Sequence, residues 1–246
     1  MAKEIGAGVH WINPCLDDDP AQHAHQSVFL IQGQSKSLLV DTGAPQLWDV
    51  VVEEVESLLG HRPLDYIYLT HAEIVHMGNS QRWMDRHPET TVLGGNVQMI
   101  VQLDPERYQQ TNPGDTLDLG DRKIEFIEPV ILDLPRTLWA YDPVSGLLTV
   151  ADAFAYFHEP GAQCDYWAEQ IRETLRPQDM VDFYVPRFPL LKYVRAEDLN
   201  REFDRVFERD VRVVAPAHGK VSLEPEWYLE VQKEAIRQLS RIGVGA

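Results

Sequence analysis

Cysteine is scarce in this chain, with only Cys15 and Cys164 among 246 residues. The two lie far apart, and neither belongs to a C-x-x-C pair. Their number and spacing argue against a disulfide framework, a zinc ribbon or an iron–sulfur cluster. A chain with two isolated thiols is expected in a reducing cytoplasm.

Long apolar runs and an excess of basic residues are also missing. No stretch approaches the about 18 apolar residues of a membrane helix, and the N-terminal MAKEIGAGVHWINP lacks the apolar core of a secretory signal. The formal net charge of -17 repels phosphate backbones. We therefore expect neither a membrane nor a nucleic acid as partner. The 44% hydrophobic and 25% charged residues are ordinary for a globular protein.

Short apolar runs alternate along the chain with amphipathic stretches of helical period. The pattern predicts strands at 28–31, 38–40, 66–69, 91–93, 123–127, 137–141, 147–150 and 211–214. It predicts helices at 46–59, 165–175, 196–209 and 228–242. Strands followed by helices, twice over, indicate an α/β (α+β) fold in which two sheets pack face to face beneath outer helices.

The densest group of candidate ligands is the segment THAEIVHMG at 70–78, directly after the predicted strand 66–69. His71 and His76 are five residues apart, so this is not the helical zinc-protease motif, in which two histidines are four apart. A loop at a strand end can bring His71, Glu73 and His76 to one centre. The alternative interpretation is a surface loop with two incidental histidines.

Two distant residues extend this group. Asp152 ends an apolar strand in TVADAF, and His218 follows a strand in APAHGK. Each has an ordinary structural interpretation, Asp152 as a helix N-cap and His218 as a structural histidine. Five donors at strand ends are, however, what an open metal cleft needs. Imidazole and carboxylate donors suit iron, zinc or manganese.

Taken in order, these motifs resemble the metallo-β-lactamase superfamily, since DTG at 41–43 precedes the segment 70–78, Asp152 and His218. Glu73 stands where most hydrolases of the superfamily have a second histidine. This glutamate is similar to the flavodiiron proteins, whose loop reads H-x-E-x-D-H.

The segment after Asp152 agrees with that subfamily, because Asp152-Ala153-Phe154 and then His158 resemble its D-A-F-G-x-H. The resemblance implies a four-layer αββα metallo-β-lactamase sandwich. About 28 residues follow His218. We therefore expect one domain over residues 1–246, with no flavodoxin or rubredoxin domain and no flavin within the chain, as in the stand-alone oxygen-binding diiron proteins.

The resemblance also implies a ligand set. His71, Glu73 and Asp152 would bind one metal. His76, Asp152 and His218 would bind a second, with Asp152 bridging the two.

Two positions depart from the family pattern. Asp133 stands in place of a histidine ligand of the first metal and can still coordinate, which favours iron or manganese. Val75 stands in place of an aspartate ligand of the second metal and cannot coordinate. His23 and His25, just before the strand at 28–31, are candidate replacements, although paired loop histidines are more often solvated or packed. We expect one tightly held metal per chain rather than two.

Three hypotheses about function follow from the resemblance. The first is a non-haem iron protein, with one or two irons, that binds or reduces dioxygen or nitric oxide as a sensor or oxidoreductase. Repeated turnover would need an external electron donor. The second is a metallo-hydrolase with an altered metal site that acts on an organic substrate. The third is a degenerate binding or assembly subunit. Members of this family commonly assemble, so we also expect a homo-oligomer.

Overall fold

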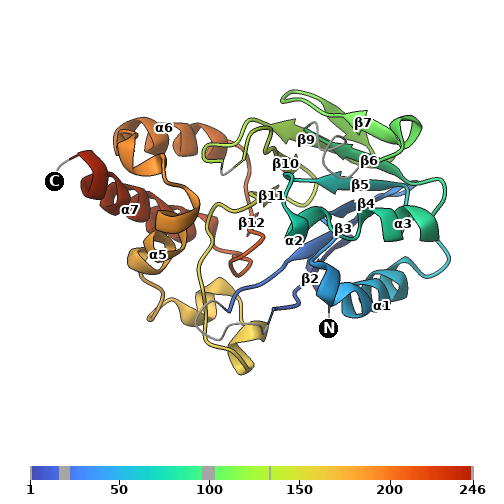
Figure 1. Ribbon diagram of the computed structural model, residues 1–246, viewed down its shortest axis with the longest axis horizontal. Coiled ribbons are helices and arrows are strands. Elements are labelled where there is room, and N and C mark those ends of the chain that lie inside the picture. The colour runs from blue at the N-terminus through green and yellow to red at the C-terminus, as the bar shows by residue number, and fades with distance from the viewer. Residues whose placement is uncertain (1, 17–22, 96–102, 133, 245–246) are drawn as a thin grey trace.

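The computed structural model describes residues 2–16, 23–95, 103–132 and 134–244, and it contains two β-sheets flanked by helices (Figure 1). The first sheet has seven strands in sequence order. They are β1 (Lys3–Gly6), β2 (Val9–Ile12), β3 (Val28–Gln32), β4 (Ser37–Val40), β5 (Tyr66–Leu69), β6 (Thr91–Gly94) and β7 (Tyr108–Gln110). Neighbours pair antiparallel up to β4 and parallel from β4 to β7.

The second sheet has five strands in the order β12-β11-β10-β9-β8. They are β8 (Thr116–Asp118), β9 (Lys123–Ile127), β10 (Trp139–Asp142), β11 (Leu147–Thr149) and β12 (Val213–Ala215). Strands β11 and β12 pair in parallel, whereas the other pairs are antiparallel.

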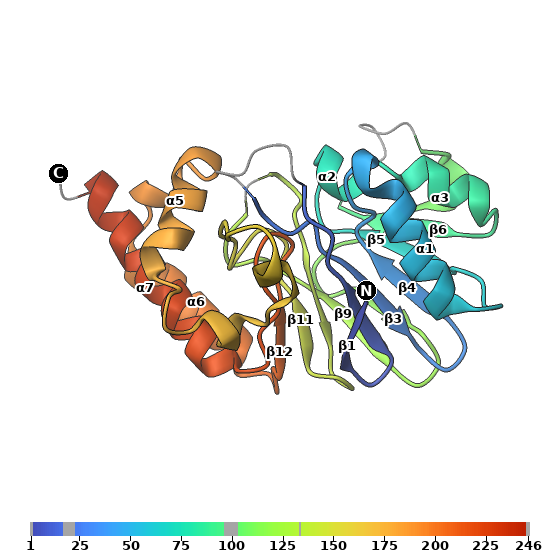
Figure 2. The same ribbon diagram turned by 90° about the horizontal axis from the view of Figure 1, so that it is seen from below.

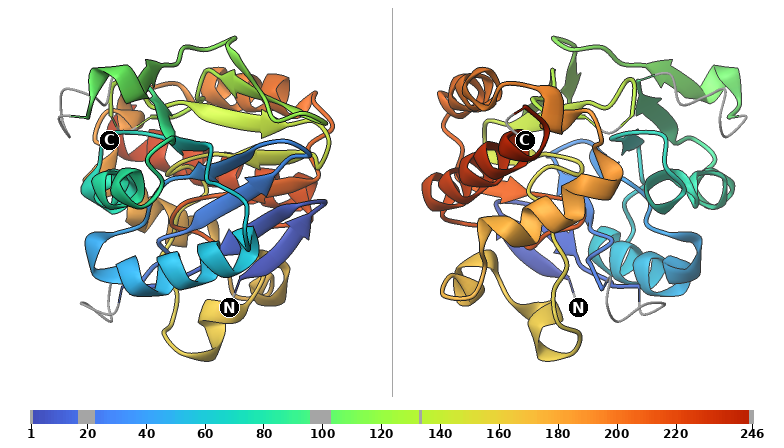
Figure 3. Two further views of the ribbon diagram at one scale, coloured as in Figure 1. Left: turned by 90° about the vertical axis from the view of Figure 1, so that its right-hand side faces the viewer. Right: turned by 60° about the vertical axis from the view of Figure 1, so that its left-hand side comes forward.

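Helices cover the outer face of each sheet (Figure 2). On the first sheet lie α1 (Trp48–Leu59), α2 (Ile74–Met77) and α3 (Ser80–Arg86). On the second lie α5 (Pro177–Arg187), α6 (Ala196–Phe207) and α7 (Pro225–Val244), as the two views of Figure 3 also show. Short 3₁₀ turns occur at η2 (Pro45–Leu47), η3 (Pro105–Arg107), η4 (Ala162–Asp165), η5 (Ala168–Ile171) and η6 (Leu191–Tyr193).

Three apolar cores hold these four layers together. Between the sheets, Trp11, Tyr68 and Phe126 are buried in one cluster. A second core joins the first sheet to α1 and a third joins the second sheet to α5, α6 and α7. Burial on both faces explains why β3, β4 and β5 read as continuous apolar runs rather than as alternating ones. The predicted αββα sandwich is confirmed. No helix of the described part of the chain is both long and apolar enough to cross a membrane.

Most predicted elements are confirmed, but the helix expected at 165–175 is wrong. That segment begins at the last residue of η4 and contains only the short 3₁₀ turn η5. The backbone N–H of Ala168 donates to the carbonyl of Val221 at 3.0 Å, so it serves a contact between segments rather than an α-helix. Helix α5 and the strands β1, β2, β7 and β8 were not predicted. The strands have only three or four residues each, and α5 contains Pro186, which does not fit a helix interior.

Polar residues that follow the strands lie at one edge of the sandwich. Asp41 follows β4 and Thr70 follows β5, its parallel neighbour. Asp152 and His218 come shortly after β11 and β12, which are also parallel to each other. Parallel strands present their carboxyl ends at the same edge, where sites commonly form.

Candidate metal centre

Five side chains meet at this edge, and we call them the strand-end cluster: His71, Glu73, His76, Asp152 and His218. One ligand atom from each of the first four lies within 4.8 Å of the others. Oδ1 of Asp152 is 3.4 Å from Nε2 of His76 and 3.4 Å from Nε2 of His218. Nε2 of His71 is 3.9 Å from the same oxygen. Oε2 of Glu73 lies 3.7 Å from His71 and 3.8 Å from His76.

The hydrogen bonds of two rings orient them toward the centre. Nδ1 of His76 donates to Oδ2 of Asp41 at 2.9 Å, and Nδ1 of His218 donates to the carbonyl oxygen of His25 at 2.8 Å. A carbonyl or carboxylate oxygen only accepts, so the proton sits on Nδ1 and the lone pair of the neutral ring on Nε2. Partners of this kind fix the tautomer and orientation of histidine ligands in metal sites.

Asp41 connects several of the residues that support the strand-end cluster from outside it. Its Oδ1 accepts the backbone N–H of Thr70 at 2.8 Å, and the Thr70 hydroxyl donates to the same carboxylate. Asp41 has a φ of 60°, a left-handed conformation that aspartate tolerates better than most residues. The DTG turn thereby links the ends of β4 and β5 to the ring of His76.

The residues after the cluster anchor its loop. Asn79 is buried, and its side-chain amide donates to the carbonyls of Thr42, Gly43 and Ala44 at 2.9–3.1 Å. A Cβ on Gly78 would lie 2.7 Å from Cγ of Pro45. Only glycine allows this close approach. Helix α2, which carries His76, is therefore held tightly against the DTG turn.

Electrostatics couple the buried members of the cluster. Burial alone would raise the pKa of Asp152, but the imidazoles of His218, His71 and His76 outweigh burial and hold this pKa well below its usual range. Burial would lower the pKa of His76, whereas Asp41 and Asp152 raise it well above its ordinary value. Asp152 and His76 thus stabilise each other's charged forms. A metal ion would have to displace the proton from His76.

Burial differs across the cluster. His71, His76 and Asp152 are only 1–3% exposed, whereas the side chain of Glu73 is 49% exposed. The neighbouring imidazole of His71 is the main reason that the pKa of Glu73 is lowered. The cluster is therefore closed on the protein side and reaches solvent at Glu73, which is where a small molecule would enter.

The donors fit a metal cation. Within the described residues, Nε2 of His76 and Oδ1 of Asp152 have no hydrogen-bond partner, although both are buried. Leaving two such atoms unsatisfied costs about 1–3 kcal/mol each. A cation between them would satisfy both. Two imidazoles and a carboxylate with open positions are the donor set of non-haem Fe(II) sites.

The remaining candidates from the sequence lie elsewhere. Asp133 falls outside the described residues. Val75 is half-buried on α2, next to His76. His23 does not join the strand-end cluster, because its Nε2 lies 3.1 Å from Sγ of Cys164. The ring of His25 is 3.3 Å from Sγ of Cys15, and only the backbone carbonyl of His25 reaches His218.

Sequence reasoning missed the supporting residues. DTG at 41–43 was recognised only as a family motif. The support that Asp41 and Thr70 give to the ring of His76 was not predicted. The same holds for the amide of Asn79. The sequence does contain a signal for these residues. The triplet DTG follows one strand and Thr-His follows the next, and such residues lie side by side if the two strands are parallel.

Comparisons with known proteins agree with this geometry. A model of the family described as ODP family beta lactamase matches residues 24–219. An oxidase of reduced coenzyme F420 from Methanothermobacter marburgensis is 26% identical over 250 residues, covering 93% of this chain and 60% of the oxidase. The putative diflavin flavoprotein A 1 of Nostoc sp. is 31% identical over 196 residues, covering 78% of this chain and 32% of the flavoprotein. The chain thus spans less than two thirds of these relatives.

Solved structures share the fold. The rubredoxin oxygen:oxidoreductase of Desulfovibrio gigas superposes with a TM-score of 0.82 at 17% identity, covering 97% of this chain and 62% of that one. A fragment of the putative diflavin flavoprotein A 5 of Nostoc sp. gives a TM-score of 0.77 at 17% identity, covering 99% and 96%. The resemblance inferred from the sequence is confirmed. Because the family match extends over most of the sequence, the chain belongs to the ODP family of beta lactamases.

Proposed function

We propose that this chain is a non-haem iron protein that binds or reduces dioxygen or nitric oxide at the strand-end cluster. The single observation that carries the proposal is the convergence of His71, Glu73, His76 and Asp152 within 4.8 Å. A relative that is an oxidase and a neighbour of the same fold that is an oxygen oxidoreductase support it. We further propose that iron, rather than zinc or manganese, is the physiological metal.

The ligand assignment follows the donors. His71, Glu73 and Asp152 would hold the first iron, together with Asp133. His76, Asp152 and His218 would hold a second, at which Val75 leaves one position without a protein ligand. Because the first set is more complete, we expect it to fill first and to bind more tightly.

An iron bound there would supply electrons to a diatomic ligand. The chain's own residues prepare the site for it. Asp41 and the carbonyl of His25 hold the rings of His76 and His218 so that each Nε2 faces Asp152. Burial of His71, His76 and Asp152 keeps water from the inner face. The exposed Glu73 leaves the outer face open to a small molecule.

The test is reconstitution of the full chain with ferrous iron under anaerobic conditions, followed by dioxygen or nitric oxide. We expect a visible or electron-paramagnetic signature that changes with each gas, and consumption of the gas once a reductant is added. The variant Glu73→Ala should weaken both responses. The exposed His61 offers a matched control, because His61→Ala should leave both unchanged.

Two other functions are outcomes of the same test. Turnover of simple ester, lactone or thioester substrates without a gas response would favour a metallo-hydrolase. A chain that resists reconstitution with any metal would favour a binding or assembly subunit. Either result would overturn the proposal.

We also propose the setting in which the site works. Electrons for repeated turnover would come from an external donor, and the relatives named as flavoproteins support an electron-transferring partner. The chain would act in the cytoplasm as a homo-oligomer. Sedimentation that gives a monomer at micromolar concentration would contradict the last point.

A further inference from the structure

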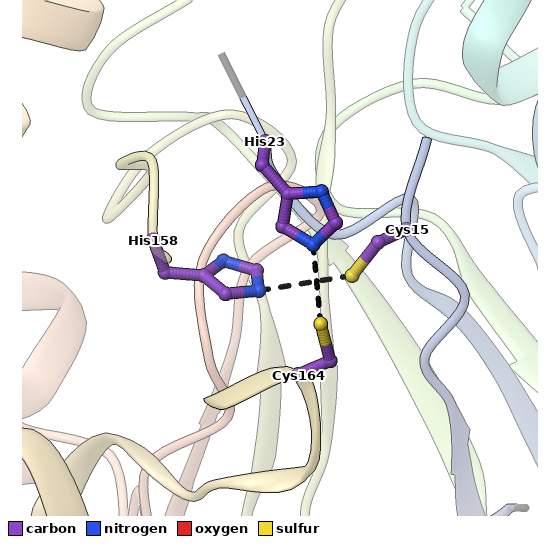
Figure 4. Close-up of side chains that lie close together, drawn as sticks. All are labelled: Cys15, His23, His158 and Cys164. Atoms are coloured by element: carbon purple, nitrogen blue, oxygen red, sulfur yellow. Dashed lines mark hydrogen bonds between the residues drawn. The ribbon is translucent and has the colours of Figure 1, made fainter. Parts of the chain in front are cut away.

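A second group of metal-binding side chains lies outside the strand-end cluster, and we call it the thiol–imidazole cluster: Cys15, His23, His158 and Cys164. Their four donor atoms all lie within 4.8 Å of one another. Nε2 of His23 is 3.1 Å from Sγ of Cys164, and Sγ of Cys15 is 3.7 Å from Nε2 of His158. Figure 4 shows the two contacts crossing, with all four side chains pointing to one centre.

The crossing arrangement matches the ligand positions of a tetrahedral metal. Zinc binds cysteine sulfur at about 2.3 Å and histidine nitrogen at about 2.0–2.1 Å, which places tetrahedral ligands about 3.3–3.8 Å apart. Of the two cross-contacts, the one at 3.7 Å lies within that range and the one at 3.1 Å lies slightly below it. Two sulfurs and two nitrogens in this geometry are typical of a closed zinc site, in which four protein ligands leave no position for substrate.

The surroundings also suit a metal with two thiolate ligands. The ring of His25 stacks on His158 at 4.5 Å between centroids, and its Nδ1 lies 3.3 Å from Sγ of Cys15. A backbone hydrogen bond of 2.9 Å joins the N–H of His158 to the carbonyl of His23. The buried Lys220 interacts electrostatically with both Cys15 and Cys164.

We propose that Cys15, His23, His158 and Cys164 bind one Zn²⁺ ion as a structural site. The two thiols would release their protons on binding, so that two thiolates and one Zn²⁺ make a neutral centre in a largely buried place. The site is independent of the iron proposed above, because it shares no ligand with the strand-end cluster.

The position of this site gives the zinc a role in the fold. It would join the segment between β2 and β3, which carries Cys15 and His23, to the segment after β11, which carries His158 and Cys164. The first segment continues into His25, whose carbonyl fixes the ring of His218. The second carries Asp152 near its start. The zinc would thus fasten together two segments that each support the strand-end cluster.

The test uses the full chain, made metal-free under reducing conditions and titrated with Co²⁺. We expect one Co²⁺ per chain to produce a thiolate-to-cobalt charge-transfer band and the intense visible bands of tetrahedral Co²⁺, and Zn²⁺ to abolish them. Cys164→Ser should remove the charge-transfer band associated with that thiolate and lower Co²⁺ affinity. Asp152→Asn, which alters a ligand of the strand-end cluster and none of these four residues, should keep the thiolate-to-cobalt charge-transfer band.

Two controls separate ligand loss from misfolding. His158→Asn should lower Co²⁺ affinity, whereas the same change at the exposed His61 should not. In the unchanged chain, Zn²⁺ should slow alkylation of both cysteines, and a chelator should restore it. No charge-transfer band and no protection by Zn²⁺ in the unchanged chain would overturn the proposal. So would a disulfide between Cys15 and Cys164, seen as the loss of two hydrogens, that forms in the presence of Zn²⁺.

Discussion

The strand-end cluster and the thiol–imidazole cluster show two ways in which one fold can gather ligands. The first uses nitrogen and oxygen donors beside strands, with Glu73 exposed to solvent. The second adds sulfur and uses residues of connecting segments. Open sites with mixed donors are typical of reactive metals, and closed sites of structural zinc. The difference indicates that one chain can hold a reactive metal site and a structural metal site, which differ in the type of ligand and in where the ligands lie in the fold.

We expect the largest effect from a change at Asp152, the carboxylate around which three imidazoles lie. Asp152→Asn keeps the size of the side chain but removes its charge. We expect iron affinity to fall by more than the about 10–100-fold that changes to outer residues cause, because a ligand itself is changed. Elemental analysis after equilibrium dialysis measures it. Retention of iron at the original affinity would contradict the assignment of Asp152 as a shared ligand.

Val75 tests whether the strand-end cluster lacks one ligand. Val75→Asp should lower metal-free stability slightly, because a second carboxylate is placed near Asp152. It should also increase metal uptake, since a divalent cation reverses the local charge. Ligand at ~100 times its dissociation constant adds roughly 2.7 kcal/mol to the free energy of unfolding. Thermal melts with and without metal measure both effects. An equal loss of stability in both conditions would mean that Val75 is a packing residue and does not stand at a metal position.

Asp41 supports the ring of His76 but is not itself a proposed ligand, so we expect a smaller effect from changing it. Asp41→Asn retains a residue that tolerates the left-handed backbone but loses the charge that holds Nδ1 of His76. We expect metal affinity to fall by about 10–100-fold, the usual result of removing such a partner. Isothermal titration gives the change. Asp118→Asn, an exposed aspartate on β8, is the control and should leave affinity unchanged.

The sequence was most informative where ligands follow strands. Histidine, glutamate and histidine within six residues form a local pattern, and Asp152 and His218 each follow an apolar run that ends abruptly. Apolar runs also predicted β3, β4 and β5 within a residue or two, because burial on both faces leaves little choice of residue. Alternation of apolar and charged residues predicted β9. These features depend on short-range sequence, so they could be found without the structure.

The thiol–imidazole cluster could not be predicted in the same way. Its members are separated by seven residues, by 134 and by five, and none lies on a predicted strand. Two lone cysteines outside C-x-x-C pairs argued against a zinc ribbon, and the paired histidines His23 and His25 were interpreted as candidates for the other cluster. Only the packing of two distant segments brings these residues together, and periodicity carries no information about that packing.

The measurement that tests the account most directly is X-ray absorption at the iron edge of the reconstituted full chain, combined with metal content. We expect about one tightly held iron per chain, with only nitrogen and oxygen atoms bound to it. Cys164→Ser should leave this iron spectrum unchanged, whereas Asp152→Asn should remove it. A sulfur neighbour around the iron, or iron that survives Asp152→Asn unchanged, would contradict the assignment of the strand-end cluster as the iron site.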